Sequence, residues 1–218
     1  MFRNFWTKSN IISRNIQHYD HIVNRINCLY AWKCSENYII NHYRSNISSY
    51  HLEIGPGTGY FLKRHNLRKN LSIQQLTLLD INQNILDYSK KHLKNDYDHD
   101  IQTLHYDIFS KKIPEYIKFN SVGINYVLHC IPGNLQDNMD TLINNLGNNG
   151  YNLFGATVIC DPLYMNPIAE YELMLLNSLG IFNNRNDTYD QFNEYLINNN
   201  IRHNIVKRGY VAIFNIQI

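Results

Sequence analysis

Residues 50–64 read YHLEIGPGTGYFLKR, and this stretch decides the fold. Its first five residues are typical of a short strand, and its last five begin a helix. Between them lie Gly55, Gly57 and Gly59, which let the chain turn sharply and approach a ligand without a Cβ in the way. The stretch therefore predicts a strand, a glycine-rich turn and a helix that begins with free N–H groups.

The alternation of strands and helices continues along the chain. Further strands are predicted at 75–80, 101–107, 119–129 (with the exit of that strand) and 151–159, helices at about 15–30, 35–47, 83–94, 135–146, 167–179 and 188–196, and a hairpin over 201–218 about Gly209 and Tyr210. This order predicts an α/β fold with a doubly wound, seven-stranded, mainly parallel sheet, to which the hairpin adds antiparallel edge strands. Ligands of such sheets bind at the carboxyl ends of the strands.

Two more of the predicted strands end in a carboxylate. Asp80 closes the second strand, 21 positions after Gly59, where it can accept hydrogen bonds from both ribose hydroxyls of an adenosine. Asp107 closes the third, and the apolar pair Ile108 and Phe109 behind it suits an adenine ring. Each aspartate alone is also explained as a cap or turn residue. Together with the glycine turn, they predict an adenosine-bearing ligand.

The spacing of the glycines separates the possible cofactors. The dinucleotide pattern G-x-G-x-x-G fails because the sixth position from Gly55 is Tyr60, and the chain has no phosphate loop of the form G-x-x-x-x-G-K-S/T. Glu53, two residues before the first glycine, would repel a pyrophosphate and attract a cation. These observations favour S-adenosylmethionine, which carries an ammonium and a sulfonium.

Composition excludes several other classes. The 218 residues are 44% hydrophobic, enough for one domain with a sizeable core. The net charge of +2 disfavours nucleic acid as the partner, and no stretch approaches the ~20 apolar residues of a membrane span. The four cysteines, Cys28, Cys34, Cys130 and Cys160, have no metal-ligand spacing and fit a reducing compartment. We therefore expect a cytoplasmic protein without a membrane segment or a bound metal.

In these motifs the sequence resembles the class I S-adenosylmethionine-dependent methyltransferases. The matching stretches are HLEIGPGTGYFL at 51–62, LTLLDIN at 76–82, HYDIF at 105–109 and FNSVGINYVLHCIPG at 119–133. The similarity to a subgroup of small bacterial and fungal proteins adds YDHIV at 19–23, AWKC at 31–34, LFGATVI at 153–159, GIFNNRND at 180–187 and RGYVAIF at 208–214. The resemblance implies a Rossmann-like fold and methyl transfer from S-adenosyl-L-methionine to a small molecule, with S-adenosyl-L-homocysteine as product.

The resemblance also implies the residues that bind the cofactor. They are Glu53, Gly55, Pro56, Gly57, Thr58 and Gly59 at the methionine end, Asp80, Ile81, Asn82, Asp107, Ile108 and Phe109 at the ribose and adenine, and Asn125 and Tyr126 after the fourth strand. Gly59 would allow a helix to approach, and Asn125 and Tyr126 would supply backbone groups near the methyl group. The block Asn125-Tyr126-Val127-Leu128 lacks the Asn/Asp-Pro-Pro-Tyr of amino-methylating DNA enzymes, which disfavours that substrate class.

The sequence offers fewer signals for catalytic residues than for cofactor-binding residues. A general base is needed only when the acceptor must lose a proton early in the reaction. His129 is the first candidate because histidine titrates near neutral pH, and Tyr126 is the second. A hydrogen-bonded structural role is the competing interpretation of His129.

Aromatic residues outside the core of the motif are candidates for the acceptor side. Tyr19, Tyr30 and Trp32 belong to predicted lid helices that could close over the sulfonium, and Tyr164 and Phe182 belong to an insertion after the fifth strand. These apolar side chains favour an apolar or aromatic acceptor. Ordinary packing against the sheet explains the same residues nearly as well.

We therefore expect a single domain over 1–218, with a lid at 1–48, a cofactor-binding core at 49–160, a substrate-side insertion at 161–187 and a final helix and hairpin at 188–218. The expected activity is methyl transfer to a small acceptor by in-line displacement. Two alternatives stay open. One is a cofactor-binding protein without chemistry; the other is an RNA or protein methyltransferase, which would need a basic stripe along the strand ends.

Overall fold

The structure, a computed structural model, describes residues 28–64, 73–97, 100–161 and 165–218. Its strands are β1 Tyr50–Ile54, β2 Gln75–Asp80, β3 Ile101–His105, β4 Ser121–Asn125, β5 Asn152–Val158, β6 Arg202–Arg208 and β7 Val211–Gln217. Its helices are α3 Cys28–Tyr30, α4 Glu36–Asn46, α5 Tyr60–Arg64, α7 Gln83–Leu93, the 3₁₀ helix η2 Leu128–Cys130, α8 Leu135–Leu146, α9 Pro167–Ser178 and α10 Tyr189–Asn198. Most of the predicted helix at 15–30 lies outside the described residues.

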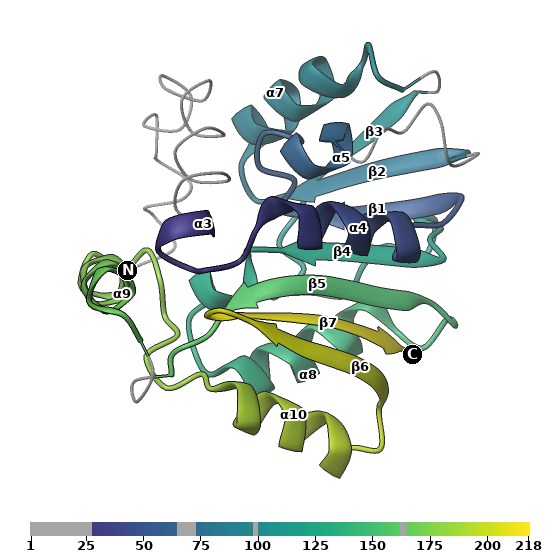
Figure 1. The fold of residues 1–218 in the computed structure, drawn as a ribbon. Helices are drawn as coiled ribbons and strands as arrows, with labels where there is room; N and C mark the ends of the chain where they lie inside the picture. The colour runs from purple at the N-terminus through teal and green to yellow at the C-terminus, as the bar shows by residue number, and fades with distance from the viewer. Residues whose placement is uncertain (1–27, 65–72, 98–99, 162–164) are drawn as a thin grey trace.

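The strands form one sheet in the order β3-β2-β1-β4-β5-β7-β6 (Figure 1). Neighbours from β3 to β5 pair in parallel, and β7 pairs antiparallel with both β5 and β6. The predicted α/β fold and the hairpin are confirmed. The hairpin differs in one respect, because β7 lies inside the sheet and β6 alone forms that edge.

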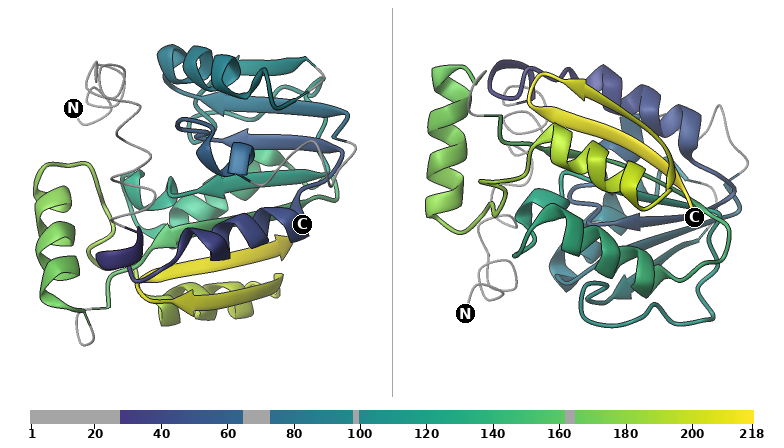
Figure 2. Two further views of the ribbon diagram at one scale, coloured as in Figure 1. Left: turned by 45° about the horizontal axis from the view of Figure 1, so that its top comes forward. Right: turned by 90° about the horizontal axis from the view of Figure 1, so that it is seen from below.

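Helices cover both faces of the sheet. Figures 1 and 2 show α4, α5 and α7 on one face and α8 and α10 on the other. Consecutive residues of β5 separate the two cores: Phe154 packs with α4, whereas Leu153 packs with α8 and α10. This alternation follows from the strand geometry, in which successive side chains point to opposite faces. Both cores contain large side chains with no exposed surface, so the sheet is a rigid support.

Side-chain caps explain where several helices begin. Asn82, Asn134 and Asn166 accept hydrogen bonds from backbone N–H groups in the first turns of α7, α8 and α9. Thr188 forms a capping box with Gln191 at the start of α10. These caps satisfy N–H groups that have no partner within the helix, and they explain part of the abundant asparagine of the chain.

Two strands are shorter than predicted, for identifiable reasons. β3 ends at His105, because the Asp107 carboxylate accepts a hydrogen bond from the Phe109 N–H and so turns the chain. β4 ends at Asn125, because Tyr126 has a φ of 58°, which an extended strand does not allow. Both ends lie at the carboxyl edge of the parallel strands, and both residues that end them are candidate site residues.

Helices α3 and α9 lie beyond the carboxyl ends of β4 and β5, and both views of Figure 2 show α9 standing apart from the sheet. They therefore flank the edge at which α/β folds bind ligands. Among the described residues, no helix is both long enough and apolar enough to cross a membrane.

Candidate active site

The turn between β1 and α5 requires glycine at two positions. Gly55 has a φ of 65°, and a Cβ there would lie 2.4 Å from Cγ2 of Val127. Gly59 has a φ of 77°, and a Cβ there would lie 3.0 Å from the Leu93 side chain of α7. Any side chain at either position would meet a neighbour and strain the backbone, so the glycines allow close packing as the sequence predicted.

The same turn is tied to α7 by side-chain hydrogen bonds. Ser89 Oγ donates to the carbonyl oxygen of Gly57 at 2.5 Å, and His92 Nδ1 donates to that of Thr58 at 2.8 Å. The Gly55 N–H also donates to the Leu79 carbonyl at 2.8 Å. The turn is therefore held in one conformation, which reduces the entropy lost when a ligand binds.

A cavity of about 230 Å³, the larger cavity, runs along the carboxyl edge of the sheet. It is lined by Ile54, Gly55, Gly57, Thr58, Leu79, Asp80, Ile81, Asn82, Ile85, Tyr106, Asp107, Ile108, Phe109, Tyr126, Val127, Cys130, Ile131, Pro132, Gly180 and Asn183. The structure thus brings together the glycine turn and the residues after β2 and β3, as the sequence predicted for an adenosine ligand.

Asp80 is the carboxylate at the end of β2. Its Oδ1 accepts a hydrogen bond from the Asn82 N–H at 2.8 Å, which leaves acceptor capacity on both oxygens. Burial raises the pKa of the Asp80 carboxyl from its usual 3.8 to about 6, and hydrogen bonds from the Asn82 and Ile81 backbone oppose that shift. A ligand that donates hydrogen bonds to this group would favour its ionised form.

Asp107 lies in the loop after β3. Its Oδ1 accepts from the Phe109 N–H at 3.1 Å and its Oδ2 from the Ser110 hydroxyl at 2.6 Å. These bonds fix the carboxylate in the wall of the cavity. Ile108 is buried and, with Phe109, gives this part of the cavity an apolar wall.

A second cavity of about 90 Å³, the smaller cavity, lies on the other side of the glycine turn. Its lining includes Glu53, Pro56 and Asn125, and it shares Gly55, Gly57, Thr58 and Tyr126 with the larger cavity. Glu53 is buried and accepts hydrogen bonds from the Tyr43 hydroxyl at 2.5 Å and from His51 Nε2 at 2.9 Å. The two cavities therefore meet at the turn, the smaller with Glu53 in its lining and the larger with Asp80 and Asp107.

Several known proteins with similar sequences are methyltransferases. Demethylluteothin O-methyltransferase of Streptomyces thioluteus is 30% identical over 186 residues, which cover 84% of this chain and 79% of that protein. Methyltransferase ctvB of Aspergillus terreus is 31% identical over 182 residues, which cover 80% and 77%. This chain belongs to the class I S-adenosylmethionine-dependent methyltransferases. No protein-family model matches the sequence.

The fold of this methyltransferase is also found among solved structures. The plantazolicin methyltransferase BpumL, crystallised with S-adenosylhomocysteine, superposes with a TM-score of 0.60 over 99% of this chain and 93% of that chain. The sequence identity is 11%, so the likeness shows a shared fold.

Tyr126 lies at the junction of the methyltransferase's two cavities. Its ring stacks on Phe61, with centroids 5.9 Å apart, and its hydroxyl is buried beside the thiols of Cys28 and Cys34. Burial raises the pKa of the Tyr126 hydroxyl well above its usual 10. The ring and backbone therefore line the site, while the hydroxyl stays protonated near neutral pH and is unsuited to be a base.

His129 lies in η2 and does not line either cavity. Its Nδ1 accepts a hydrogen bond from the Val158 N–H at 3.2 Å, and its ring meets Phe182 edge-on at 4.2 Å. Burial lowers the pKa of His129 from 6.5 to about 3. This position agrees with the competing, structural interpretation and does not bring the imidazole to the site as a base.

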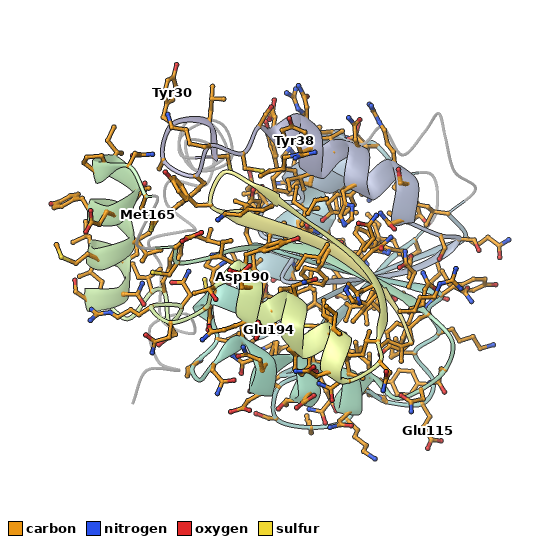
Figure 3. The ribbon with its side chains drawn as sticks, turned by 60° about the horizontal axis from the view of Figure 1, so that its bottom comes forward. Tyr30, Tyr38, Glu115, Met165, Asp190 and Glu194 are labelled. Carbon is orange, nitrogen blue, oxygen red and sulfur yellow. The ribbon has the colours of Figure 1, made fainter. Side chains whose placement is uncertain are left out.

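The predicted lid aromatics are dispersed. Trp32 and Phe182 are buried and pack against each other, with ring centroids 5.9 Å apart. Neither residue lines either cavity. Tyr30 is 60% exposed and points away from the sheet (Figure 3). Tyr19 and Tyr164 lie outside the described residues. Of the residues predicted for the acceptor side, none in the described part of the chain reaches the larger cavity.

The far end of the larger cavity, here called the acceptor end, is formed by residues that were not among the predicted site residues, although Gly180 and Asn183 lie in the predicted substrate-side insertion at 161–187. It consists of Val127, Cys130, Ile131, Pro132, Gly180 and Asn183. Asn183 joins the two segments, because its N–H donates to the His129 carbonyl at 2.7 Å and its Nδ2 to the Cys130 carbonyl at 3.1 Å. The stretch GIFNNRND, quoted for the resemblance, was the available signal for this region.

Proposed function

We propose that this methyltransferase binds S-adenosylmethionine across both cavities and methylates a small, apolar or aromatic molecule held at the acceptor end. The observation that carries this proposal is one continuous cavity, which joins Asp80 and Asp107 at one end to Cys130 and Asn183 at the other. Cofactor and acceptor would then lie end to end, as direct transfer of a methyl group requires.

The residues present fit the cofactor. Asp80 offers a carboxylate to the ribose hydroxyls, and Asp107 with Ile108 and Phe109 offers an acceptor and an apolar wall to adenine. The smaller cavity holds the buried Glu53, and its Asn125 Oδ1 is a buried acceptor without a hydrogen-bond partner among the described residues. A buried acceptor beside a carboxylate suits the ammonium of the methionine part.

The acceptor end favours a neutral, apolar molecule. Its side chains are those of Val127, Ile131 and Pro132, with Cys130 as a small partly exposed thiol. The one side-chain amide at this end is that of Asn183, and its Nδ2 donates a hydrogen bond to the Cys130 carbonyl. The Asn183 Oδ1 is therefore the atom that can accept a hydrogen bond from the molecule to be methylated. We propose that this oxygen orients an acceptor hydroxyl or N–H toward the cofactor.

When bound, S-adenosylmethionine supplies a methyl group on a positively charged sulfur that leaves as a neutral thioether. The protein's contribution is position and exclusion of water, and good orientation alone is worth ~7–11 kcal/mol. Burial raises the pKa of the Cys130 thiol to about 12, so near neutral pH it stays protonated and does not accept a proton. We therefore propose that in-line displacement here rests on positioning by the acceptor end.

Two measurements on the full chain test this function. Isothermal titration with S-adenosylmethionine should give saturable binding that S-adenosylhomocysteine abolishes. Transfer of a labelled methyl group should then be found in a panel of phenols, amines and thiols, and preferentially with aromatic members. Binding without transfer to any member of the panel would favour the catalytically silent alternative, and absence of binding would refute the proposal.

A further inference from the structure

A chain of buried hydrogen bonds runs through the sheet behind Glu53. In parallel register, His51 of β1 lies beside Ser121 of β4, and Glu53 lies beside Gly123. His51 Nδ1 is 2.8 Å from Ser121 Oγ, and its Nε2 is 2.9 Å from Glu53 Oε2. His51, Glu53 and Ser121 are each at most 2% exposed, so these bonds do not compete with water.

The other oxygen of Glu53 continues the chain toward the smaller cavity. The Tyr43 hydroxyl donates to Glu53 Oε1 at 2.5 Å, and Asn125 Nδ2 donates to the Tyr43 hydroxyl at 3.0 Å. The five residues Ser121, His51, Glu53, Tyr43 and Asn125 are called the Glu53 relay from here on.

The direction of each bond follows from the chemistry of its members. Ser121 Oγ accepts from the Ser48 N–H, so it can donate its own proton to His51 Nδ1. Glu53 accepts hydrogen bonds at both oxygens, from His51 Nε2 and from the Tyr43 hydroxyl. The Tyr43 hydroxyl donates its one proton to Glu53, so its oxygen can only accept a hydrogen bond from Asn125. The Asn125 atom that faces Tyr43 is therefore the donor Nδ2 and not Oδ1.

This assignment has two consequences for the smaller cavity. The Glu53 relay holds one buried carboxyl group and contains no Lys or Arg side chain. The Oδ1 of Asn125 faces away from Tyr43 and is left buried without a partner among the described residues. A buried carboxyl group and a buried orphan acceptor, in residues that line one small pocket, favour a ligand that donates hydrogen bonds there, as an ammonium does.

The relay is also fixed by packing. Tyr43 lies between Phe61 and Phe154, with ring centroids 6.2 Å and 5.3 Å away, and His51 stacks on Phe154 at 5.7 Å. A Cβ at position 123 would lie 2.3 Å from Glu53 Oε2, so only glycine at this position leaves enough space for the Glu53 carboxyl group. The acceptors are therefore already oriented before a ligand arrives.

Given the proposed function, we propose that the Asn125 side chain is a second ligand of the cofactor ammonium, and that Tyr43 and His51 are positioning residues that hold the Glu53 carboxyl group in place. The relay thus makes binding selective for ligands with an amino group.

The test compares two ligands that differ by that group alone. They are S-adenosylhomocysteine and its deamino analogue, 5′-S-(3-carboxypropyl)-5′-thioadenosine, measured by titration calorimetry on the full chain. The wild-type protein should bind S-adenosylhomocysteine at least about tenfold more tightly, the loss expected for one charge-assisted hydrogen bond. If the protein binds neither ligand, the proposed function fails; if it binds both equally, only the relay proposal fails.

Variants then assign the preference to single residues. Asn125→Leu and Tyr43→Phe should each lose most of the preference for the amino ligand while binding the deamino analogue as the wild type does. Tyr151→Phe is the matched control, because it removes a buried tyrosine hydroxyl that lines neither cavity and, unlike that of Tyr43, makes no hydrogen bond to the described residues. Retention of the full preference in Asn125→Leu, with a wild-type melting temperature, would overturn the proposal.

His51 gives an independent check that does not depend on Asn125. His51→Gln keeps an N–H donor for Glu53 and should retain much of the preference, whereas His51→Leu removes that donor and should lose it. Equal effects of the two substitutions on the affinity ratio would show that His51 serves packing alone and would contradict its positioning role.

Discussion

The two ends of the larger cavity are built in different ways. The cofactor end is formed by backbone, two aspartates and an apolar wall directly after β1, β2 and β3, and its glycine turn is tied to α7 by Ser89 and His92. The acceptor end combines apolar side chains that follow β4 with Gly180 and Asn183, about 50 residues further along the chain, and the two segments meet where Asn183 bonds to the residues of η2.

This difference indicates which part of the cavity determines specificity for the methyl acceptor. Strand ends in parallel sheets fall at fixed places, so the cofactor end presents its carboxylates in a geometry that the fold itself supplies. The acceptor end depends on packing between the loop after α9 and η2, so substitutions there change which molecule fits without disturbing the fold of the sheet. Variants of the two ends should therefore affect different ligands.

The largest effect is expected at the cofactor end. Asp80→Ala should weaken the binding of S-adenosylhomocysteine about 100-fold, because two charge-assisted hydrogen bonds to the ribose are lost. Asp87→Ala, at an exposed position of α7, is the matched control and should change nothing. Calorimetry with both variants measures the difference; wild-type affinity in Asp80→Ala would refute the assignment of this carboxylate to the ribose.

A smaller effect is expected from pH at the same carboxylate. Since the Asp80 pKa is about 6 and the ribose hydroxyls favour the ionised form, binding should be about tenfold weaker at pH 5 than at pH 7. In the free protein the same carboxyl group affects the stability of the fold in the opposite direction. The raised pKa stabilises the fold at low pH, and this contribution is lost as the pH rises through about 6.

Asp80→Asn separates this carboxylate from the other titrating groups. The substituted amide does not ionise, so the affinity of the variant for S-adenosylhomocysteine should be nearly the same at pH 5 and pH 7. A pH dependence equal to that of the wild type would place its origin in another group.

At the acceptor end we expect a moderate effect that leaves the cofactor untouched. Asn183→Leu should raise KM for the acceptor about fivefold to tenfold, the range for one lost neutral hydrogen bond, with unchanged affinity for S-adenosylhomocysteine. Asn186→Leu is an exposed control in the same loop. A loss of cofactor affinity in Asn183→Leu would contradict the division between the two ends.

The smallest effect is expected at His129, between the two ends. His129→Asn keeps an acceptor for the Val158 N–H, so turnover should fall by less than tenfold, well below the ~100-fold or more that a general base contributes. The pH profile of turnover should also keep its shape. Severe loss of turnover with intact cofactor affinity would restore His129 as the base.

The cofactor end was largely predictable because its determinants are local. The glycine turn, Asp80 and Asp107 each follow a strand in the sequence, and the larger cavity brings them together. The end of β4 was not predictable, because the positive φ of Tyr126 departs from the pattern of apolar residues that extends the strand to His129. Its ring is held by Phe61, a contact that appears only when the chain is folded.

Other residues were missed for reasons that differ. The acceptor end brings together residues near 130 and 183, and the hydrophobic periodicity of a sequence does not indicate contacts between segments that far apart. Trp32 and Phe182 were chosen because they are aromatic, yet core packing uses the same residue types. His51 had a readable signal, because residues two apart in a strand share a face, which brings His51 to Glu53.

The central claim is that the carboxyl edge of this sheet binds S-adenosylmethionine through its acidic residues. Titration calorimetry of the wild-type chain with S-adenosylmethionine, repeated with Asp80→Ala, tests it most directly. The account predicts saturable binding to the wild type and binding about 100-fold weaker to the variant. No heat of binding to the wild type, or equal affinity in both proteins, would contradict it.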